Sequence, residues 1–250
     1  GYIWITNFTG NTTEDFLDAL EKLESENAPM KGLVLDLRNN GGGLLEESLR
    51  ISDIFIDDGI ILSIKGRGEG NAKEFPAKAD SVKRDYPIVM LINGGSASAS
   101  EIVAGALQDH KRALILGTTS FGKGSVQTVE SLRDGYGLKL TIARYYTPSG
   151  RSIQAKGIEP DIVVPFKLLE EADQANGEDG FVKESDLKNH LEGPAEPKEK
   201  PAVEEKETPS VNGAESRVNP LEMDNLKRDN QIMRALDILV SYDLFKHLGS

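Results

Sequence analysis

The 250-residue chain contains no cysteine, only three histidines and a single tryptophan. The absence of thiols excludes disulfides, a cysteine nucleophile and a thiolate metal site. No apolar run reaches the roughly 18 residues that a membrane-spanning helix needs. Basic side chains are also scarce, 29 against 41 acidic ones, and the net charge of −12 argues against a nucleic-acid partner, because phosphate binding needs a basic surface.

These absences narrow the chemistry. No spacing of His, Asp and Glu suggests a metal site, so we expect neither a metal nor another cofactor. Without cysteine and with so few histidines, a serine activated by a lysine is the best candidate for covalent catalysis. Because the sequence offers such a pair, described next, it predicts an enzyme.

A serine-rich turn follows the apolar run 87–92. It reads Gly-Gly-Ser-Ala-Ser-Ala-Ser-Glu over residues 94–101. Ser98 and Glu101 have the spacing of a capping box, which places Ser98 at the start of a helix over 99–110. The unpaired N–H groups and the positive dipole end there would stabilise an alkoxide or an oxyanion. The alternative is that Ser96, Ser98 and Ser100 are ordinary helix caps, and the string alone leaves both open.

A lysine flanked by glycines lies 25 positions beyond Ser98, in Phe121-Gly122-Lys123-Gly124. A lysine can accept a proton near neutral pH only where burial favours its neutral amine. The apolar run 113–116 leads into this loop, and the glycines let its backbone pass close to other segments. A solvent-exposed loop lysine is the competing interpretation.

Two other motifs overlap this loop. Gly117–Lys123 matches a phosphate-binding loop at every position except the last, where Gly124 replaces the hydroxyl residue that holds Mg²⁺. The residues that follow favour a strand, whereas a phosphate loop leads into a helix. Ser120 and Lys123 also fit the Ser-x-x-Lys of penicillin-binding enzymes, but the glycines disfavour the helix that this motif needs. Nucleotide binding stays as a minor alternative.

Strands and helices alternate through the first 166 residues. Strand patterns cover 1–8, 32–37, 60–64, 87–92, 113–116, 125–129 and 137–146, with a turn at Asp134-Gly135. Helical patterns cover 11–26, 44–55 and 99–110. Buried strands separated by helices indicate an α/β fold with helix-covered sheets.

The remaining residues divide into two segments. Residues 167–218 are acidic and rich in Pro, Glu and Lys, with too few apolar side chains to offset the entropy of ordering, so we expect partial disorder. Residues 219–250 predict a C-terminal helix that packs on the core, begun by Asn219-Pro220 and carrying Ile232, Met233, Leu236 and Leu239 at helical spacing. The predicted domains are therefore a core over 1–166, the acidic segment and this helix.

Four blocks in one order resemble the carboxyl-terminal processing (tail-specific) serine proteases of peptidase family S41. They are residues 36–43, residues 98–102 together with Phe-Gly-Lys-Gly, residues 147–154 and residues 157–161. The resemblance covers roughly residues 1–166. It implies a crotonase-like α/β fold of layered sheets, related to the Clp protease subunit, and a serine endopeptidase that cleaves proteins near apolar C-terminal tails in processing or quality control. A member of this fold that binds peptides without catalysis is the alternative.

The resemblance also implies roles for single residues. Ser98 matches the nucleophile, Lys123 the general base and Gln127 the residue that orients the lysine. Strand alternation is compatible with that third role, because residues 123, 125 and 127 of an extended chain share a face. The implied oxyanion donors are the backbone N–H of Ala99 and one from the glycine turn, Gly41 or Gly42. The supporting residues are Asp36, Arg38 and Asp109.

Members of this family usually carry a PDZ domain before the catalytic core, and this chain begins at about the point where that domain would end. We therefore expect a catalytic-core fragment whose PDZ domain and targeting segment are missing. The resemblance implies a periplasmic or otherwise extracytoplasmic location, with a membrane anchor compatible with the full-length protein. The sequence is also compatible with a homo-oligomer.

Overall fold

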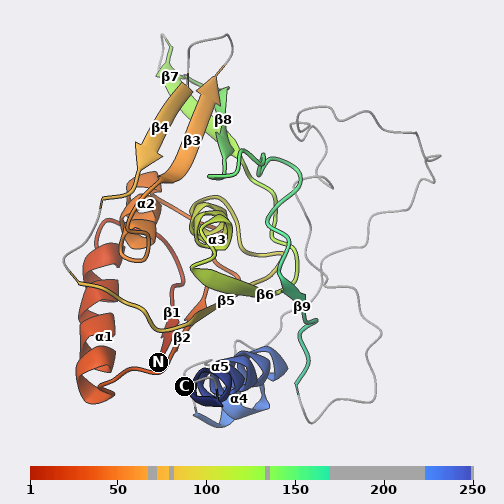
Figure 1. Cartoon of the computed structure of the whole chain (residues 1–250). Coiled ribbons are helices and arrows are strands. Elements are labelled where there is room, and N and C mark those ends of the chain that lie inside the picture. Colours follow the sequence, from red (N-terminus) through yellow and green to blue (C-terminus); the bar gives the residue numbers. More distant parts are fainter. Residues whose placement is uncertain (67–71, 79–81, 133–135, 169–222, 249–250) are drawn as a thin grey trace.

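The computed structural model describes residues 1–66, 72–78, 82–132, 136–168 and 223–248. Two sheets organise these residues, as Figure 1 shows. One sheet has five parallel strands in the order β1-β2-β5-β6-β9, and the other has four antiparallel strands in the order β4-β3-β8-β7. The α/β class predicted from the sequence is confirmed.

The five-stranded sheet lies between two helical layers. Its strands are β1 (Tyr2–Trp4), β2 (Leu33–Asp36), β5 (Ile88–Ile92), β6 (Ala113–Gly117) and β9 (Ile162–Val163). Helices α1 (Thr12–Glu26), α2 (Leu45–Asp53) and α3 (Ala99–Asp109) lie on one side, and α4 (Met223–Arg228) and α5 (Asn230–Leu248) lie on the other (Figure 1). Strands β2 and β5 are buried along their whole length, as parallel strands covered on both faces must be.

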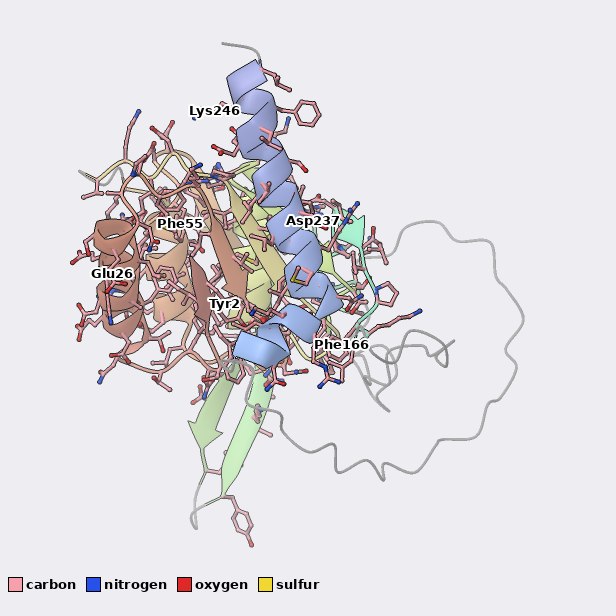
Figure 2. All side chains as sticks on the ribbon, turned by 90° about the horizontal axis from the view of Figure 1, so that it is seen from below. Tyr2, Glu26, Phe55, Phe166, Asp237 and Lys246 are labelled. Carbon is pink, nitrogen blue, oxygen red and sulfur yellow. The ribbon has the colours of Figure 1, made fainter. Side chains whose placement is uncertain are left out.

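Side-chain alternation distributes these strands between two cores. Leu35 of β2 and Met90 of β5 contribute to the core beneath α1 and α3. Val34 and Val89, one position earlier in each strand, face the opposite way. They pack in a second core with Ile232, Ala235 and Leu239 of α5. The C-terminal helix therefore covers a sheet face that would otherwise be exposed, and Figure 2 shows α5 lying across the strands.

Helix α3 is the central element of the first core. Every residue from Ala99 to Leu107 is buried, because β6, α2 and β3 pack around it. Small side chains make this possible. A Cβ atom at Gly105 would lie 2.8 Å from the Thr147 methyl group, closer than packed carbon atoms approach one another.

The antiparallel sheet consists of β3 (Ile60–Gly66), β4 (Ala72–Pro76), β7 (Ser125–Ser131) and β8 (Gly137–Tyr146). Strands β7 and β8 form a hairpin that extends away from the helices (Figure 1). Leu138, Leu140 and Ile142 of β8 are exposed. Helix coverage, predicted for the sheets generally, therefore does not extend to this hairpin.

Several predicted elements differ from those found. The strand predicted over 1–8 is confined to Tyr2–Trp4, and the two missed strands are β4 and the two-residue β9. The C-terminal helix is present as α4 and α5, whereas its predicted start at Asn219-Pro220 lies outside the described residues, as do most of the acidic segment and the Asp134-Gly135 turn. No helix within the described ranges is both long and apolar enough to cross a membrane.

Candidate active site

Ser98 lies where the chain turns from β5 into α3. It is the residue before the first helical turn, with φ 56° and ψ −111°. A positive φ is uncommon outside glycine and indicates a backbone held by its surroundings. The backbone N–H of Ser98 donates to Oε2 of Glu101 at 2.8 Å, so the carboxylate half of the predicted capping box is present.

The other two serines of the turn are committed to structural hydrogen bonds. Ser96 Oγ donates to the carbonyl of Leu37 at 2.8 Å, and Ser100 Oγ donates to that of Asn40 at 2.8 Å. Both side chains are fully buried, whereas Ser98 is only half-buried. Of the three candidates, Ser98 is the one that a substrate can reach.

The glycine turn at residues 41–43 packs against Ser98. A Cβ atom at Gly42, where φ is 96°, would lie 2.6 Å from the Ala97 carbonyl oxygen and 2.9 Å from the Ala99 nitrogen. Only glycine therefore fits there. No side chain from position 42 therefore crowds the Ala99 N–H.

The N–H groups of this turn are not equivalent. Gly42 N–H donates to Oδ1 of Asn40 at 2.9 Å. Gly41 is exposed, and within the described part of the chain no group accepts a hydrogen bond from its N–H or from that of Ala99. Of the two glycines predicted as oxyanion donors, Gly41 has the available N–H, and Gly42 provides the close approach.

The loop that carries Lys123 is anchored to the same carboxylate as Ser98. Oε2 of Glu101 accepts the Lys123 N–H at 2.9 Å, in addition to the Ser98 N–H. Oε1 accepts the Gly122 N–H at 2.7 Å and the Ser120 hydroxyl at 2.6 Å. One fully buried side chain thus joins the backbones of the two residues predicted to react.

Burial dominates the electrostatics of this carboxyl group. Desolvation raises the pKa of Glu101 to about 7, although hydrogen bonds from Ser120 and from the backbone of Ser98, Gly122 and Lys123 favour its charged form. Four donors surround two oxygen atoms. Their hydrogen bonds oppose the rise in pKa but do not outweigh the loss of hydration.

Further bonds fix the rest of the lysine loop. Gly124 N–H donates to Oε1 of the buried Gln154 at 3.1 Å, and the Gly122 carbonyl accepts the Ala155 N–H at 2.8 Å. The side chain of Lys123 itself is half-buried. The loop is therefore held on both sides of the lysine.

These contacts contradict the phosphate-loop alternative. A phosphate loop needs free backbone N–H groups, and those of Gly122 and Lys123 already bind Glu101. The residues that follow form strand β7 where a phosphate loop would lead into a helix. The nucleotide-binding interpretation of Gly117–Lys123 is wrong on this geometry.

Gln127 is held less tightly in the structure than Ser98 and Lys123. It lies in β7, pairs with Thr141 of β8 and is exposed. Strand β7 begins only at Ser125, and no hydrogen bond among the described side chains joins Gln127 to Lys123. Its role in orienting the lysine remains a prediction.

The predicted supporting residues lie at two different places. Asp109, at the far end of α3, accepts the Ser149 N–H at 2.8 Å and forms an ion pair with Arg151. It thus holds the turn at 147–151 and does not touch Ser98. Asp36 and Arg38 form a buried ion pair just before the glycine turn. Glu101 and Gln154 are the positions that sequence reasoning missed as site residues, although the capping-box spacing had marked Glu101 as a helix cap.

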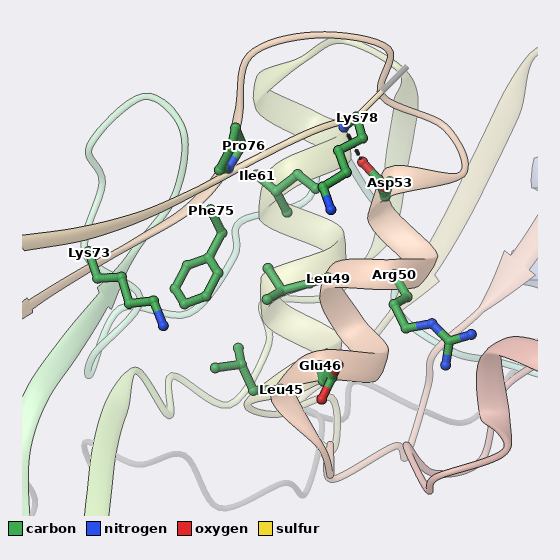
Figure 3. Close-up of a pocket in the computed structure, with 10 residues that line it drawn as sticks. All are labelled: Leu45, Glu46, Leu49, Arg50, Asp53, Ile61, Lys73, Phe75, Pro76 and Lys78. Atoms are coloured by element: carbon green, nitrogen blue, oxygen red, sulfur yellow. Dashed lines mark hydrogen bonds between the residues drawn. The ribbon is translucent and has the colours of Figure 1, made fainter. Parts of the chain in front are cut away.

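A groove of about 630 Å³ begins at Leu45, two residues beyond the glycine turn. Figure 3 shows it between α2 and strands β3 and β4. Leu45, Leu49, Ile61 and Phe75 form its apolar walls, and charged side chains from Glu46, Arg50, Asp53, Lys73 and Lys78 surround it.

Comparisons with known proteins identify relatives of this chain. The family model described as peptidase family S41 matches residues 1–164. A carboxy-terminal-processing protease of Bartonella bacilliformis is 49% identical over 198 residues, which are 78% of this chain and 45% of that protein. The chloroplastic C-terminal processing peptidase of Tetradesmus obliquus is 42% identical over 68% of this chain and 36% of its own length.

A solved structure supports the same assignment. The photosystem II D1 C-terminal processing protease superposes with a TM-score of 0.62 at 40% identity, over 66% of this chain and 42% of that one. The chain spans less than half the length of each of these relatives. Because the family model covers most of the chain and all four sequence blocks lie within it, the chain belongs to peptidase family S41.

Proposed function

We propose that this chain is the catalytic core of a serine endopeptidase that cleaves proteins near their C-terminal tails. The observation that carries the proposal is the carboxylate of Glu101, which accepts hydrogen bonds from the backbone N–H groups of both Ser98 and Lys123. The packing of Gly42 against Ala97, Ser98 and Ala99 supports it independently.

In the proposed mechanism Ser98 Oγ attacks the scissile carbonyl carbon while the neutral amine of Lys123 takes the hydroxyl proton. The developing oxyanion accepts hydrogen bonds from the N–H groups of Ala99 and Gly41. The protonated lysine then gives its proton to the leaving amine, which departs as the acyl-enzyme forms. Water attacks the ester with Lys123 again as base, and Ser98 is regenerated. Gln127 would orient the lysine amine.

The groove between α2 and β3–β4 supports a preference for apolar side chains. Its walls are aliphatic and aromatic, and its lining residue Leu45 lies two positions after the glycine turn in the sequence, so we propose that an extended substrate lying over Ser98 places a side chain there. We propose proteins with apolar C-termini as substrates, in processing or quality control. The similarity to relatives named as carboxy-terminal-processing proteases supports this class.

The fuller protein is part of the same proposal. We infer that a PDZ domain precedes this core, that the arrangement of its sheets is crotonase-like, and that the protein acts outside the cytoplasm. The greater length of the relatives is consistent with additional domains. Fusing the whole gene product to a reporter that is active only outside the cytoplasm would test the location.

The activity is tested with an unfolded protein that ends in an apolar tail. It is incubated with the chain, with Ser98→Ala and with Lys123→Ala, and fragments are measured by mass spectrometry. Cleavage by the unchanged chain that both variants lose by at least about 100-fold supports the proposal. Equal behaviour of all three proteins would instead indicate a peptide-binding member without catalysis, provided that the substrate still binds.

A further inference from the structure

Arg38 joins the glycine turn to the C-terminal helix, 191 residues away in the sequence. It follows β2 and its guanidinium is bound by Asp36 of that strand. The same guanidinium donates through Nη1 to Asp229 Oδ2 at 2.7 Å and to Gln231 Oε1 at 2.8 Å. The aromatic ring of Phe166 lies 6.0 Å from it.

The carboxylate of Asp229 has two functions in this contact. Its Oδ1 accepts the N–H groups of Gln231 at 2.9 Å and of Ile232 at 3.1 Å, at the start of α5. Its Oδ2 pairs with Arg38. One side chain therefore caps the helix and shares with Asp36 the pairing of the buried arginine.

The contact is buried. Arg38 and Asp229 are 8% and 9% exposed. Breaking one contact of a buried ionic cluster is unfavourable, although Asp36 would still pair with Arg38 when Asp229 is replaced. Gln231 adds a second connection, since its Nε2 donates to the Val164 carbonyl at 2.6 Å. The start of α5 is thus fixed to both the end of β2 and the segment after β9.

From Arg38 the chain runs directly into the proposed oxyanion turn. Asn39 N–H donates to Asn93 Oδ1 at 2.9 Å, and Asn40 holds the Gly42 N–H. The Asn40 carbonyl accepts the Ala97 N–H at 3.0 Å. Residues 38–42 therefore connect two parts of the molecule. They contact the start of α5 through the Arg38 side chain, and the Ser98 turn through the Asn40 carbonyl.

We infer that Asp229 is a positioning residue for the oxyanion turn and acts on it through Arg38. The inference rests on the proposed function, in which Gly41 and Ala99 bind the oxyanion. Asp229 lies beyond the residues that the family model matches. With this role for Asp229, the C-terminal helix belongs to the catalytic unit of this chain and is not only a cover for the sheet.

The test replaces Asp229 with asparagine in the whole chain. The substituted amide would present a donor to the Arg38 guanidinium, which also donates. The matched control is Asp243→Asn on the same helix, because Asp243 pairs with the exposed Lys31 at the surface. We expect kcat to fall at least about 10-fold in Asp229→Asn with KM within about 2-fold, measured well below the unfolding temperature, and neither to change in the control.

Nuclear magnetic resonance gives a readout that is independent of activity. In Asp229→Asn the amide signals of Gly41, Gly42 and Ala99 should shift, in addition to those of α5. A change confined to α5 and the facing strands, with kcat preserved, would mean that Asp229 merely docks the helix and would overturn the inference. Cleavage that survives Ser98→Ala would count against the proposed function alone, while the amide signals still decide the role of Asp229.

Discussion

A single oxygen of Glu101 accepts hydrogen bonds from the backbone N–H groups of both Ser98 and Lys123, at 2.8 and 2.9 Å. The two residues proposed to react are thereby spaced by a third, whose side chain is fully buried. This relationship makes the Ser/Lys pair sensitive to a residue that looks, from the sequence, like an ordinary helix cap.

Glu101→Gln should lower activity more than stability. The amide nitrogen would face two backbone donors where an oxygen now accepts them, and each displaced buried donor weakens the loop that holds Lys123. We expect kcat to fall by about 10- to 100-fold while the circular dichroism spectrum stays unchanged. Steady-state kinetics at pH 8 checks this, and wild-type kcat in the variant would refute the role of Glu101.

The same residue predicts a pH dependence of stability. Burial raises the pKa of Glu101 from its ordinary 4.5 to about 7, so the folded state binds this proton more tightly than the unfolded chain does. Its contribution is fully present below about pH 4.5 and is lost as the pH rises to about 7, a change on the order of 3 kcal/mol. Denaturant unfolding of the unchanged chain and Glu101→Gln, compared from pH 5 to 8, measures it. Parallel profiles for the two proteins would contradict the assignment.

Gly42→Ala should disrupt the site through its backbone. A methyl group there would overlap the Ala97 carbonyl oxygen and would require a left-handed conformation of alanine. The conformational cost alone is about 1–2 kcal/mol. We expect loss of cleavage and reduced labelling of Ser98 by a fluorophosphonate probe. Gly10→Ala is the control, because a Cβ atom at Gly10 would meet nothing within 4 Å; equal labelling of the two variants would argue against the close packing.

Phe75→Ala tests the groove. Loss of this ring from the apolar wall should raise KM for a peptide with a leucine or phenylalanine near the cleavage site by about 3- to 10-fold, and leave kcat within about 2-fold. Phe245→Ala serves as the control, since Phe245 is 73% exposed on α5, across the sheet from the groove. If both variants keep the wild-type KM, the groove does not bind the substrate.

Local signals explain why Ser98 could be located from the sequence. A buried strand, two glycines and a capping-box spacing all lie within residues 88–101, and each limits the backbone on its own. Strand β4 carries no comparable signal because most of its side chains are exposed, and β9 is only two residues long.

Long-range contacts explain what could not be predicted. The partners of Glu101 include residues 19 to 22 positions away, and Arg38 meets Asp229 across 191 positions. Neither pairing leaves a periodic pattern, because each depends on how separate elements dock. Gln127 illustrates the converse, since strand alternation suggested a shared face with Lys123 but β7 begins only after the lysine.

The complete burial of α3 has a consequence for how this protein can vary. A helix with a solvent face tolerates substitution along one side, but Ala99–Leu107 has none. In a saturation mutagenesis library we therefore expect an unbroken block of intolerance over these positions, without the three-to-four-residue rhythm of a surface helix. Natural variation in cleavage preference would then have to arise in the strands and loops around the helix, while the segment that begins at Ser98 stays almost fixed.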